Sequence, residues 1–231
     1  MLDKVLIKTD NIGAHKATFI VIKAPKKDAR QELVFKELSD GSWISKISSF
    51  LQSTYIVRLK GTIDHFESLI KDNNSSILQY IGEKIVTICS NIAIEENLNF
   101  RRLPLGDVFK SRADGNGGFD FYNENTSSWY ILFGEGKYVN GVNAYSRALA
   151  QIRQFINEQK DVNDIGDLQN LVSEQSIVNF TNGIKSFSTG FSMFSEGNRI
   201  PQILENIKEN DHFKELISIY DIVIVGVMFD E

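Results

Sequence analysis

Residues 117–155 read GGFDFYNENTSSWYILFGEGKYVNGVNAYSRALAQIRQF. Two apolar runs, at 119–122 and 129–133, flank a polar cluster at 123–128 and are rich in aromatic and β-branched residues. This pattern predicts an antiparallel β-hairpin. Apolar residues recur at helical spacing beyond a loop of Gly and Asn, so we expect a helix over 144–158.

The hairpin carries charged residues at positions suited to metal chemistry. Asp120 interrupts the first apolar run, and the second ends in Glu135-Gly136-Lys137. Side chains alternate along a strand, so Glu135 and Lys137 share one face. Hard divalent cations prefer carboxylate, carbonyl and water oxygens, so Asp120, Glu135 and the Gly136 carbonyl could hold one ion. Lys137 could orient an attacking water or stabilise charge on a phosphate.

The Glu-x-Lys tripeptide has little weight without this setting. A second copy, Glu158-Gln159-Lys160, falls at the expected end of a helix. The first copy differs because it closes an apolar strand and follows Asp120 by 15 residues across a plausible hairpin. The alternative interpretation is a surface hairpin in which Lys137 forms a salt bridge with a carboxylate.

Composition indicates an ordinary globular chain. With 231 residues, 42% apolar and 24% charged, the chain can bury one sizeable core. No apolar run approaches the roughly 18 residues of a membrane helix, and no secretion signal is visible, so we expect a cytoplasmic protein without a membrane partner. A single cysteine, Cys89, excludes an internal disulfide, and His15, His65 and His212 lack metal-ligand spacing.

Charge divides the chain unevenly. Residues 1–112 contain 17 Lys and Arg against 13 Asp and Glu, whereas residues 113–231 contain 8 against 17. The split suits an acidic metal-binding half beside a basic half that contacts phosphates or a partner, although chance surface asymmetry gives the same numbers. A basic connector, 23–30 (KAPKKDAR), is either such a contact or a solvated helix start. Further candidate contacts are Arg101, Arg102, Lys110 and Arg112.

The remaining elements follow from periodicity. We expect a helix over 75–96, where Ile and Leu recur at steps of three or four residues. The region 161–194 is polar and predicts helical pieces at 165–172 and 177–184. Additional strands are expected over 4–9 and 17–22 (an opening hairpin), 54–59 and 220–229. The resulting prediction is a central mixed sheet containing 118–122, 129–137 and 220–228, with helices 75–96 and 144–158 on its faces.

A strand with Asp, a turn, a strand with Glu-x-Lys and a helix together resemble the core of the PD-(D/E)XK nuclease superfamily. The resemblance implies an α/β fold: a restriction-endonuclease-like mixed central sheet flanked by helices in residues 73–231, after a small N-terminal α+β lobe in residues 1–72. It implies a metal-dependent deoxyribonuclease that uses Mg²⁺ or Mn²⁺. The implied catalytic residues are Asp120, Glu135, Lys137 and Gln151, and the implied metal ligands are Asp120, Glu135, Gly136 and Glu83.

Two of these assignments have alternatives, and three positions depart from the family pattern. Glu83 lies on the preceding helix, which often supplies an acidic residue in this superfamily, but it is equally a surface residue. Gln151 and Phe155 resemble the Gln-x-x-x-Tyr extension of RecB-like members, with Phe in place of Tyr; Gln151 is otherwise a helix-surface amide. Phe119 replaces the Pro of the superfamily name. Gly136 replaces an apolar residue, which puts the packing behind that strand in doubt.

The arrangement looks most similar to the nuclease subunit of Hachiman-type bacterial antiphage systems, the HamA-like family; the resemblance could extend over most of the chain, but only the core at 118–155 is specific. The similarity rests on GFDF, FGEGKY, the helix that reaches Gln151 and the late apolar strand. It implies a DNA nuclease that works with a helicase partner in a defence complex. A non-cleaving module of the same fold, which binds nucleic acid or acts as a scaffold for a partner, is the alternative.

Overall fold

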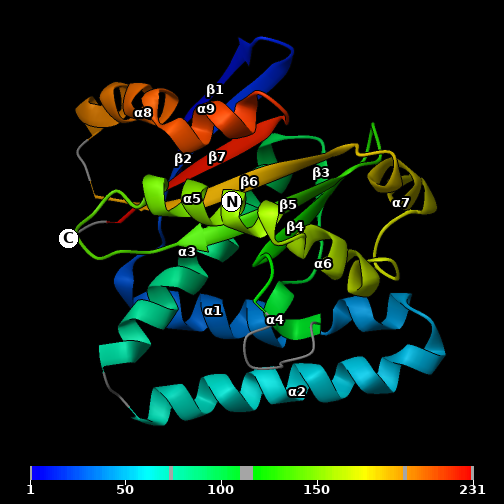
Figure 1. Ribbon diagram of the computed structural model, residues 1–231. Helices are drawn as coiled ribbons and strands as arrows, with labels where there is room; N and C mark the ends of the chain where they lie inside the picture. The colour runs from blue at the N-terminus through cyan, green and yellow to red at the C-terminus, as the bar shows by residue number, and fades with distance from the viewer. Residues whose placement is uncertain (1, 73–74, 110–116, 195–196, 230–231) are drawn as a thin grey trace.

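The computed structural model describes residues 2–72, 75–109, 117–194 and 197–229. Its centre is a seven-stranded mixed sheet in the order β1-β2-β7-β6-β5-β4-β3 (Figure 1). The strands are β1 (Lys4–Ile12), β2 (His15–Lys23), β3 (Phe100–Arg102), β4 (Phe121–Asn125), β5 (Ile131–Lys137), β6 (Lys185–Met193) and β7 (Ile222–Met228). The central strands β2, β7, β6 and β5 are parallel, whereas β1 at one edge and β4 and β3 at the other pair antiparallel.

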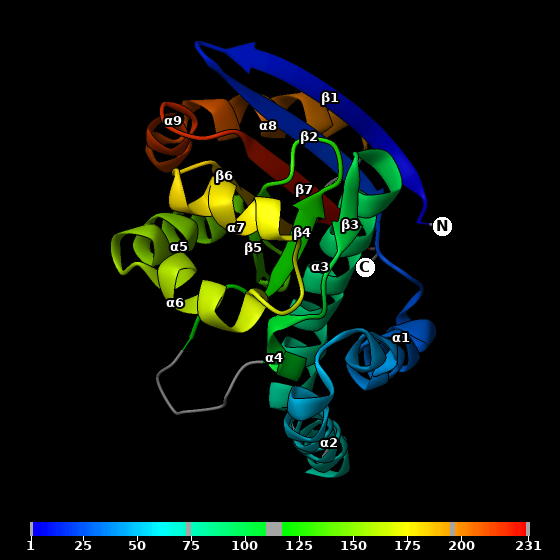
Figure 2. The ribbon, with the colours of Figure 1, turned by 90° about the vertical axis from the view of Figure 1, so that its right-hand side faces the viewer.

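Helices cover both faces of the sheet (Figure 2). They are α1 (Arg30–Ser39), α2 (Ser49–Asp72), α3 (Ser75–Asn97), α4 (Gly106–Phe109), α5 (Tyr145–Asn157), α6 (Lys160–Leu168), α7 (Glu174–Thr181), α8 (Ile200–Glu209) and α9 (Asp211–Ile217). Helix α3 crosses one face, and α5 covers the opposite face. Helices α1 and α2 pack outside α3 as a further layer. The predicted placement of helices 75–96 and 144–158 is therefore confirmed.

Helix α3 is the most apolar helix of the fold. Its segment Ile77–Asn97 is long and apolar enough to cross a membrane by composition alone, yet most of it is buried inside the molecule. Cys89 lies on this helix and is fully buried, and burial raises the pKa of its thiol to about 12. The apolar composition of α3 is thus accounted for by its packing against the sheet.

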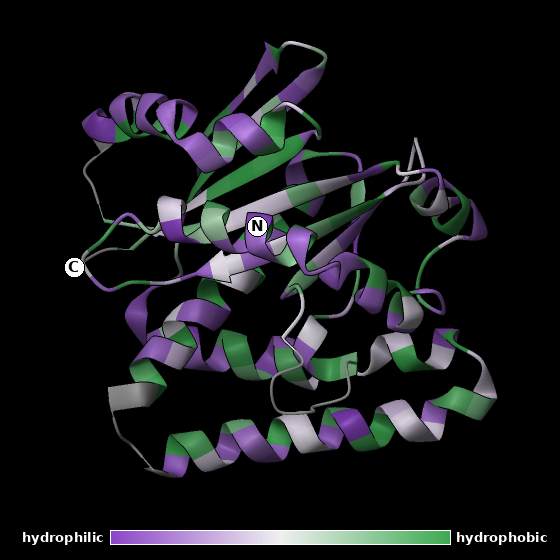
Figure 3. Ribbon diagram, viewed as in Figure 1, coloured by the Kyte–Doolittle hydropathy of each residue, from purple (hydrophilic) through white to green (hydrophobic). Residues whose placement is uncertain are grey.

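The two innermost strands differ in chemistry. The β7 sequence, IVIVGVM, is buried on both faces, as expected for a central parallel strand. The neighbouring β6 sequence, KSFSTGFSM, is equally buried but contains small polar residues, and Figure 3 shows its ribbon pale beside the green of β7. The sequence predicted only helical pieces within 161–194. They correspond to α6 and α7, but the prediction missed β6, which lies at the centre of the sheet.

The N-terminal part contains one wrong prediction. The expected strand at 54–59 lies inside α2, because Tyr55, Thr62 and Phe66 are buried along one side of a continuous helix. Its β-branched residues Ile56 and Val57 face solvent instead. The opening hairpin is confirmed, and its second strand joins β7, so it belongs to the same sheet as the later strands. A domain boundary after residue 72 stays a prediction.

Candidate active site

The start of β4 places Asp120 beside β5. The ladder pairs Phe121 with Gly134, and the Asp120 amide donates to the Gly134 carbonyl at 2.8 Å. One residue before the strand begins, the Asp120 carboxylate accepts a hydrogen bond from the Gly136 amide at 2.9 Å. The carboxylate therefore takes the place that a continuing β4 would occupy. Asp120 precedes the strand rather than interrupting it, and the strand runs over Phe121–Asn125 instead of 118–122.

The turn before Asp120 is held from α6. The Phe119 amide donates to the Asp164 carboxylate at 3.0 Å, and the Tyr122 hydroxyl lies 2.5 Å from the same oxygen. The Phe119 ring is buried, and its centroid lies 5.3 Å from that of Phe155 on α5. Two departures from the family pattern, Phe119 and Phe155, thus pack against each other, which gives both a structural reason.

Glu135 is buried with an unsatisfied carboxylate oxygen. It is 3% exposed, its Oε1 lies 3.5 Å from Lys137 Nζ, and its Oε2 has no hydrogen-bond partner in the part of the chain that the structure describes. Burial, followed by the charge of Asp120, raises the pKa of Glu135 well above its ordinary value, although Lys137 and Lys84 oppose the shift. An acidic group in this state carries a desolvation cost that a bound cation would remove.

Gly136 brings α3 close to the site. A Cβ at this position would lie 2.3 Å from Thr87 Oγ1, so the helix can approach only because the residue is Gly. Thr87 Oγ1 in turn donates to the Asp120 carboxylate at 3.5 Å, at the long limit of a hydrogen bond. The doubt about packing behind Gly136 is resolved: a polar helix residue occupies the space of the missing side chain.

Lys84 is a second lysine near these carboxylates, and no motif in the sequence selects it. It lies on α3 one turn before Thr87, is almost fully buried and forms an ion pair with Asp107. Burial lowers the pKa of its ammonium group, but the charges of Asp107 and Asp120 outweigh burial and raise the pKa overall. The only sequence signal for Lys84 is its i, i+3 spacing from Thr87, which places the two side chains on one side of α3. Which part of the sheet that side faces depends on where α3 crosses it.

Thr189 is the other residue that sequence reasoning missed. It lies in β6, directly opposite Glu135 in the parallel ladder, and both residues are buried. Its Oγ1 finds no hydrogen-bond partner within the described residues. Two adjacent strands therefore present unpaired oxygens side by side. Because β6 was not predicted as a strand, no sequence pattern could have placed Thr189 here.

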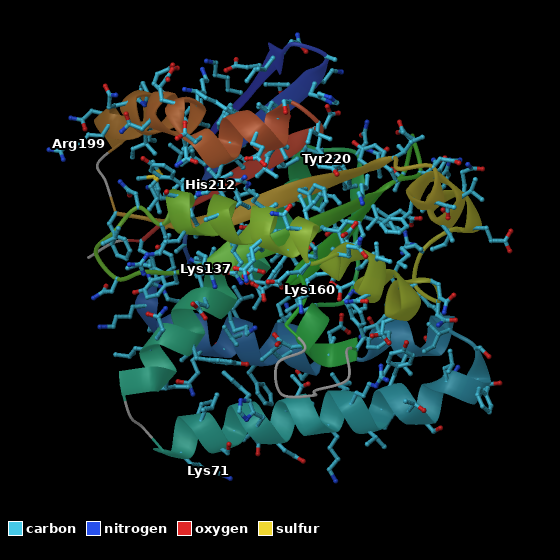
Figure 4. All side chains as sticks on the ribbon, viewed as in Figure 1. Lys71, Lys137, Lys160, Arg199, His212 and Tyr220 are labelled. Atoms are coloured by element: carbon cyan, nitrogen blue, oxygen red, sulfur yellow. The ribbon has the colours of Figure 1, made fainter. Side chains whose placement is uncertain are left out.

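The structure brings Asp120, Glu135 and Lys137 together, but not every expected residue joins them. Lys137 lies between α5 and α3, as Figure 4 shows. Glu83, on α3, accepts a hydrogen bond from Gln79 at 3.2 Å. Gln151 is half-buried on α5, and its side-chain amide makes no hydrogen bond within the described residues. In the described ranges, no three His, Cys, Asp or Glu side chains converge in a way that could hold a metal ion.

The basic residues proposed as contacts are partly engaged inside the molecule. Arg101 pairs with Glu124, and Arg102 pairs with Glu37 and Glu95. Lys110 and Arg112 lie outside the described residues. The nucleic-acid or partner contact expected for this group stays a prediction.

Comparison with known proteins adds no family assignment: no protein-family model matches the sequence, and no curated protein matches it significantly.

Proposed function

We propose that this chain is a metal-dependent deoxyribonuclease of the PD-(D/E)XK superfamily, and that it is the HamA-like nuclease subunit of a cytoplasmic Hachiman-type antiphage complex with a helicase. The observation that carries the proposal is the unsatisfied Oε2 of buried Glu135, beside Asp120 and Lys137. Burial of an unpaired carboxylate destabilises the fold when no cation is bound, and a bound cation would offset that cost and serve cleavage. The order of α3, the β3–β4–β5 meander, α5 and β6 supports a restriction-endonuclease-like fold.

The donors present fit a hard divalent cation. Asp120 and Glu135 would supply carboxylate oxygens, and the Gly136 carbonyl leaves the same strand edge as the amide that contacts Asp120. Mg²⁺ or Mn²⁺ at this position would polarise a phosphodiester and lower the pKa of a bound water. Lys137 lies on the face of β5 that carries Glu135, where its ammonium would stabilise charge that develops on the phosphate. Thr87 and the Gly136 amide hold the Asp120 carboxylate in place.

The test compares two Glu-x-Lys copies in one chain. Glu135→Gln with Lys137→Ala removes the site, whereas Glu158→Gln with Lys160→Ala removes an ion pair with a 3.8 Å N–O distance at a helix end. Labelled plasmid, linear and single-stranded DNA are incubated with each protein in Mg²⁺, Mn²⁺ or EDTA. We expect the first double variant to lose at least about 100-fold in cleavage rate and the second to match the wild type.

Metal binding gives a readout that needs no partner. Isothermal titration with Mn²⁺ should detect binding to the wild-type chain and to the Glu158/Lys160 variant, but not to the Glu135/Lys137 variant. Equal binding by all three proteins, or full cleavage by the Glu135/Lys137 variant, would contradict the nuclease proposal. DNA binding without metal binding or cleavage would favour the non-cleaving module instead.

A further inference from the structure

A cavity of about 710 Å³ lies where the parallel strands end. Three of its lining residues directly follow a strand: Tyr138 follows β5, Phe194 follows β6 and Phe229 follows β7. The basic connector follows β2, the fourth parallel strand, and contributes Lys27 and Arg30. These ends gather on one side of the molecule (Figure 1, left). Open α/β sheets bind ligands at the carboxyl ends of their strands, and the volume suits a nucleotide-sized group.

The three aromatic rings form one cluster. The Tyr138 centroid lies 5.0 Å from that of Phe229 and 6.0 Å from that of Phe194, and Phe194 stacks on Phe229 at 5.5 Å. The Tyr138 ring also presses on α3, where a Cβ at Gly82 would lie 2.4 Å from it. Tyr138 and Phe194 remain half-buried, so their rings are accessible at the cavity wall. Accessible aromatic surface of this kind favours stacking by a planar group.

The cavity also carries uncompensated positive charge. The Arg30 guanidinium lies 4.6 Å from the Phe229 centroid, and its Nε donates to the Pro25 carbonyl at 2.9 Å. Lys27 is exposed at the rim. Neither side chain pairs with a carboxylate of the described residues, in contrast to Arg101 and Arg102. Two cations beside an aromatic wall are complementary to an anionic ligand with a planar ring.

This cavity adjoins the candidate active site along β5, although Asp120, Glu135 and Lys137 do not line it. Tyr138 is the residue after Lys137, and its carbonyl accepts a hydrogen bond at 2.8 Å from Gln79, which also contacts Glu83. A DNA strand with one nucleotide in the cavity would therefore contact Tyr138, the residue next to Lys137.

We propose that this cavity is the subsite that receives an unpaired nucleotide of a single-stranded DNA substrate. The base stacks on the wall formed by Tyr138 and Phe194, and the phosphate contacts Lys27 and Arg30. This inference rests on the proposed nuclease function and specifies its substrate. Bases in an intact duplex are stacked on each other and cannot enter, so single strands or frayed ends are selected.

The test measures binding without cleavage. Fluorescence anisotropy of a labelled 12-mer of deoxythymidylate is recorded with the full chain in EDTA, and a duplex of equal length serves as comparison. Lys27→Glu places a negative charge on the cavity rim, whereas Lys26→Glu makes the same change at the neighbouring exposed residue, which does not line the cavity. We expect Lys27→Glu to weaken single-strand binding about tenfold and Lys26→Glu to weaken it less than about threefold.

Cross-linking provides direct evidence for the base position. A 12-mer that contains 5-iododeoxyuridine is irradiated on the chain, and mass spectrometry should locate the adduct at Tyr138 or Phe194. Adducts elsewhere only, equal losses for Lys26→Glu and Lys27→Glu, or stronger binding of the duplex would overturn the subsite. If the wild type binds the 12-mer and cross-links at Tyr138 or Phe194 but cleaves no DNA, the nuclease proposal fails and the subsite stands.

Discussion

Two buried glutamates occupy opposite ends of one face of the β4–β5 hairpin. Glu124 is 0% exposed and accepts hydrogen bonds from Arg101 Nε at 2.6 Å, the Ser173 amide at 2.7 Å and the Ser176 hydroxyl at 2.5 Å. These partners outweigh burial and lower the pKa of Glu124. Glu135 is 3% exposed, has one long contact with Lys137 and has a raised pKa.

The difference separates a buried glutamate with a structural role, Glu124, from one whose burial has no structural explanation, Glu135. A carboxylate that accepts several hydrogen bonds is stable in its ionised form, whereas one without partners destabilises the fold. Glu124 anchors the start of α7 to the sheet, because both serines lie at the N-terminus of that helix. Within the described residues, the printed side-chain contact of Glu135 is the long one to Lys137 on its own strand, so it ties no second element to the sheet. The fold keeps the unfavourable burial of the Glu135 carboxylate, which is expected if the proposed cation binds there.

Removing Glu124 should cause the largest loss of stability. Glu124→Ala leaves the Ser173 amide and the Ser176 hydroxyl without their acceptor, and we expect the free energy of unfolding to fall by about 3 kcal/mol. Arg101 is 45% exposed and can be hydrated when Glu124 is removed, so the loss of this ion pair contributes little to the change in the free energy of unfolding. Urea unfolding measures the change, and Glu124→Gln, which keeps one acceptor oxygen, should lose about half as much. An unchanged midpoint for Glu124→Ala would remove the contrast between the two glutamates.

The opposite sign is expected at Glu135. Without metal, Glu135→Gln should stabilise the protein by about 1 kcal/mol at pH 7, because an uncharged amide replaces a buried acid. The pKa of Glu135 is raised in the folded state from an ordinary value of 4.5, so its protonated form favours folding below pH 4.5 and that contribution is lost as pH rises through the folded-state pKa. The gain from Gln should therefore be near zero below pH 4.5 and grow above it.

Thermal unfolding in EDTA between pH 2 and pH 8 measures this dependence. Glu124→Gln serves as the comparison, because the lowered pKa of Glu124 gives the reverse trend: its contribution is present above pH 4.5 and is lost as pH falls through the folded-state pKa. A destabilised Glu135→Gln variant at pH 7 would show that Glu135 is satisfied in solution and would weaken the case for a cation.

The sequence predicted the hairpin and its helices because their signals are local. The apolar runs at 119–122 and 129–133 mark the hairpin, although β4 begins and ends three residues later than the predicted 118–122, and the apolar periodicity defines α3 and α5. The proximity of Asp120, Glu135 and Lys137 followed from the hairpin pairing alone. These predictions needed no knowledge of contacts between distant segments.

The remainder depends on contacts that a sequence does not show. Helix α3 crosses β6 closely at Gly190, where a Cβ would lie 2.2 Å from Ser90 Oγ, and this packing favours small residues on that face of the strand. The same close approach brings Lys84 to the site, and the β5–β6 register brings Thr189. In α2, helical burial of Tyr55 and Phe66 overrode the strand preference of 54–59. Each miss is an effect of tertiary packing.

Among the acidic residues, Glu83 is expected to have the smallest effect on metal binding. Glu83 is half-exposed on α3, its contact is with Gln79, and it does not complete a cluster of three acidic side chains within the described residues. An exposed carboxylate near a cation interacts through water, so its charge contributes little. We expect Glu83→Gln to change the dissociation constant for Mn²⁺ by less than about threefold, whereas Glu135→Gln abolishes measurable binding. Titration of both variants under one condition decides the matter: a loss at Glu83 equal to that at Glu135 would make Glu83 a ligand and require α3 to move toward Asp120 when metal binds.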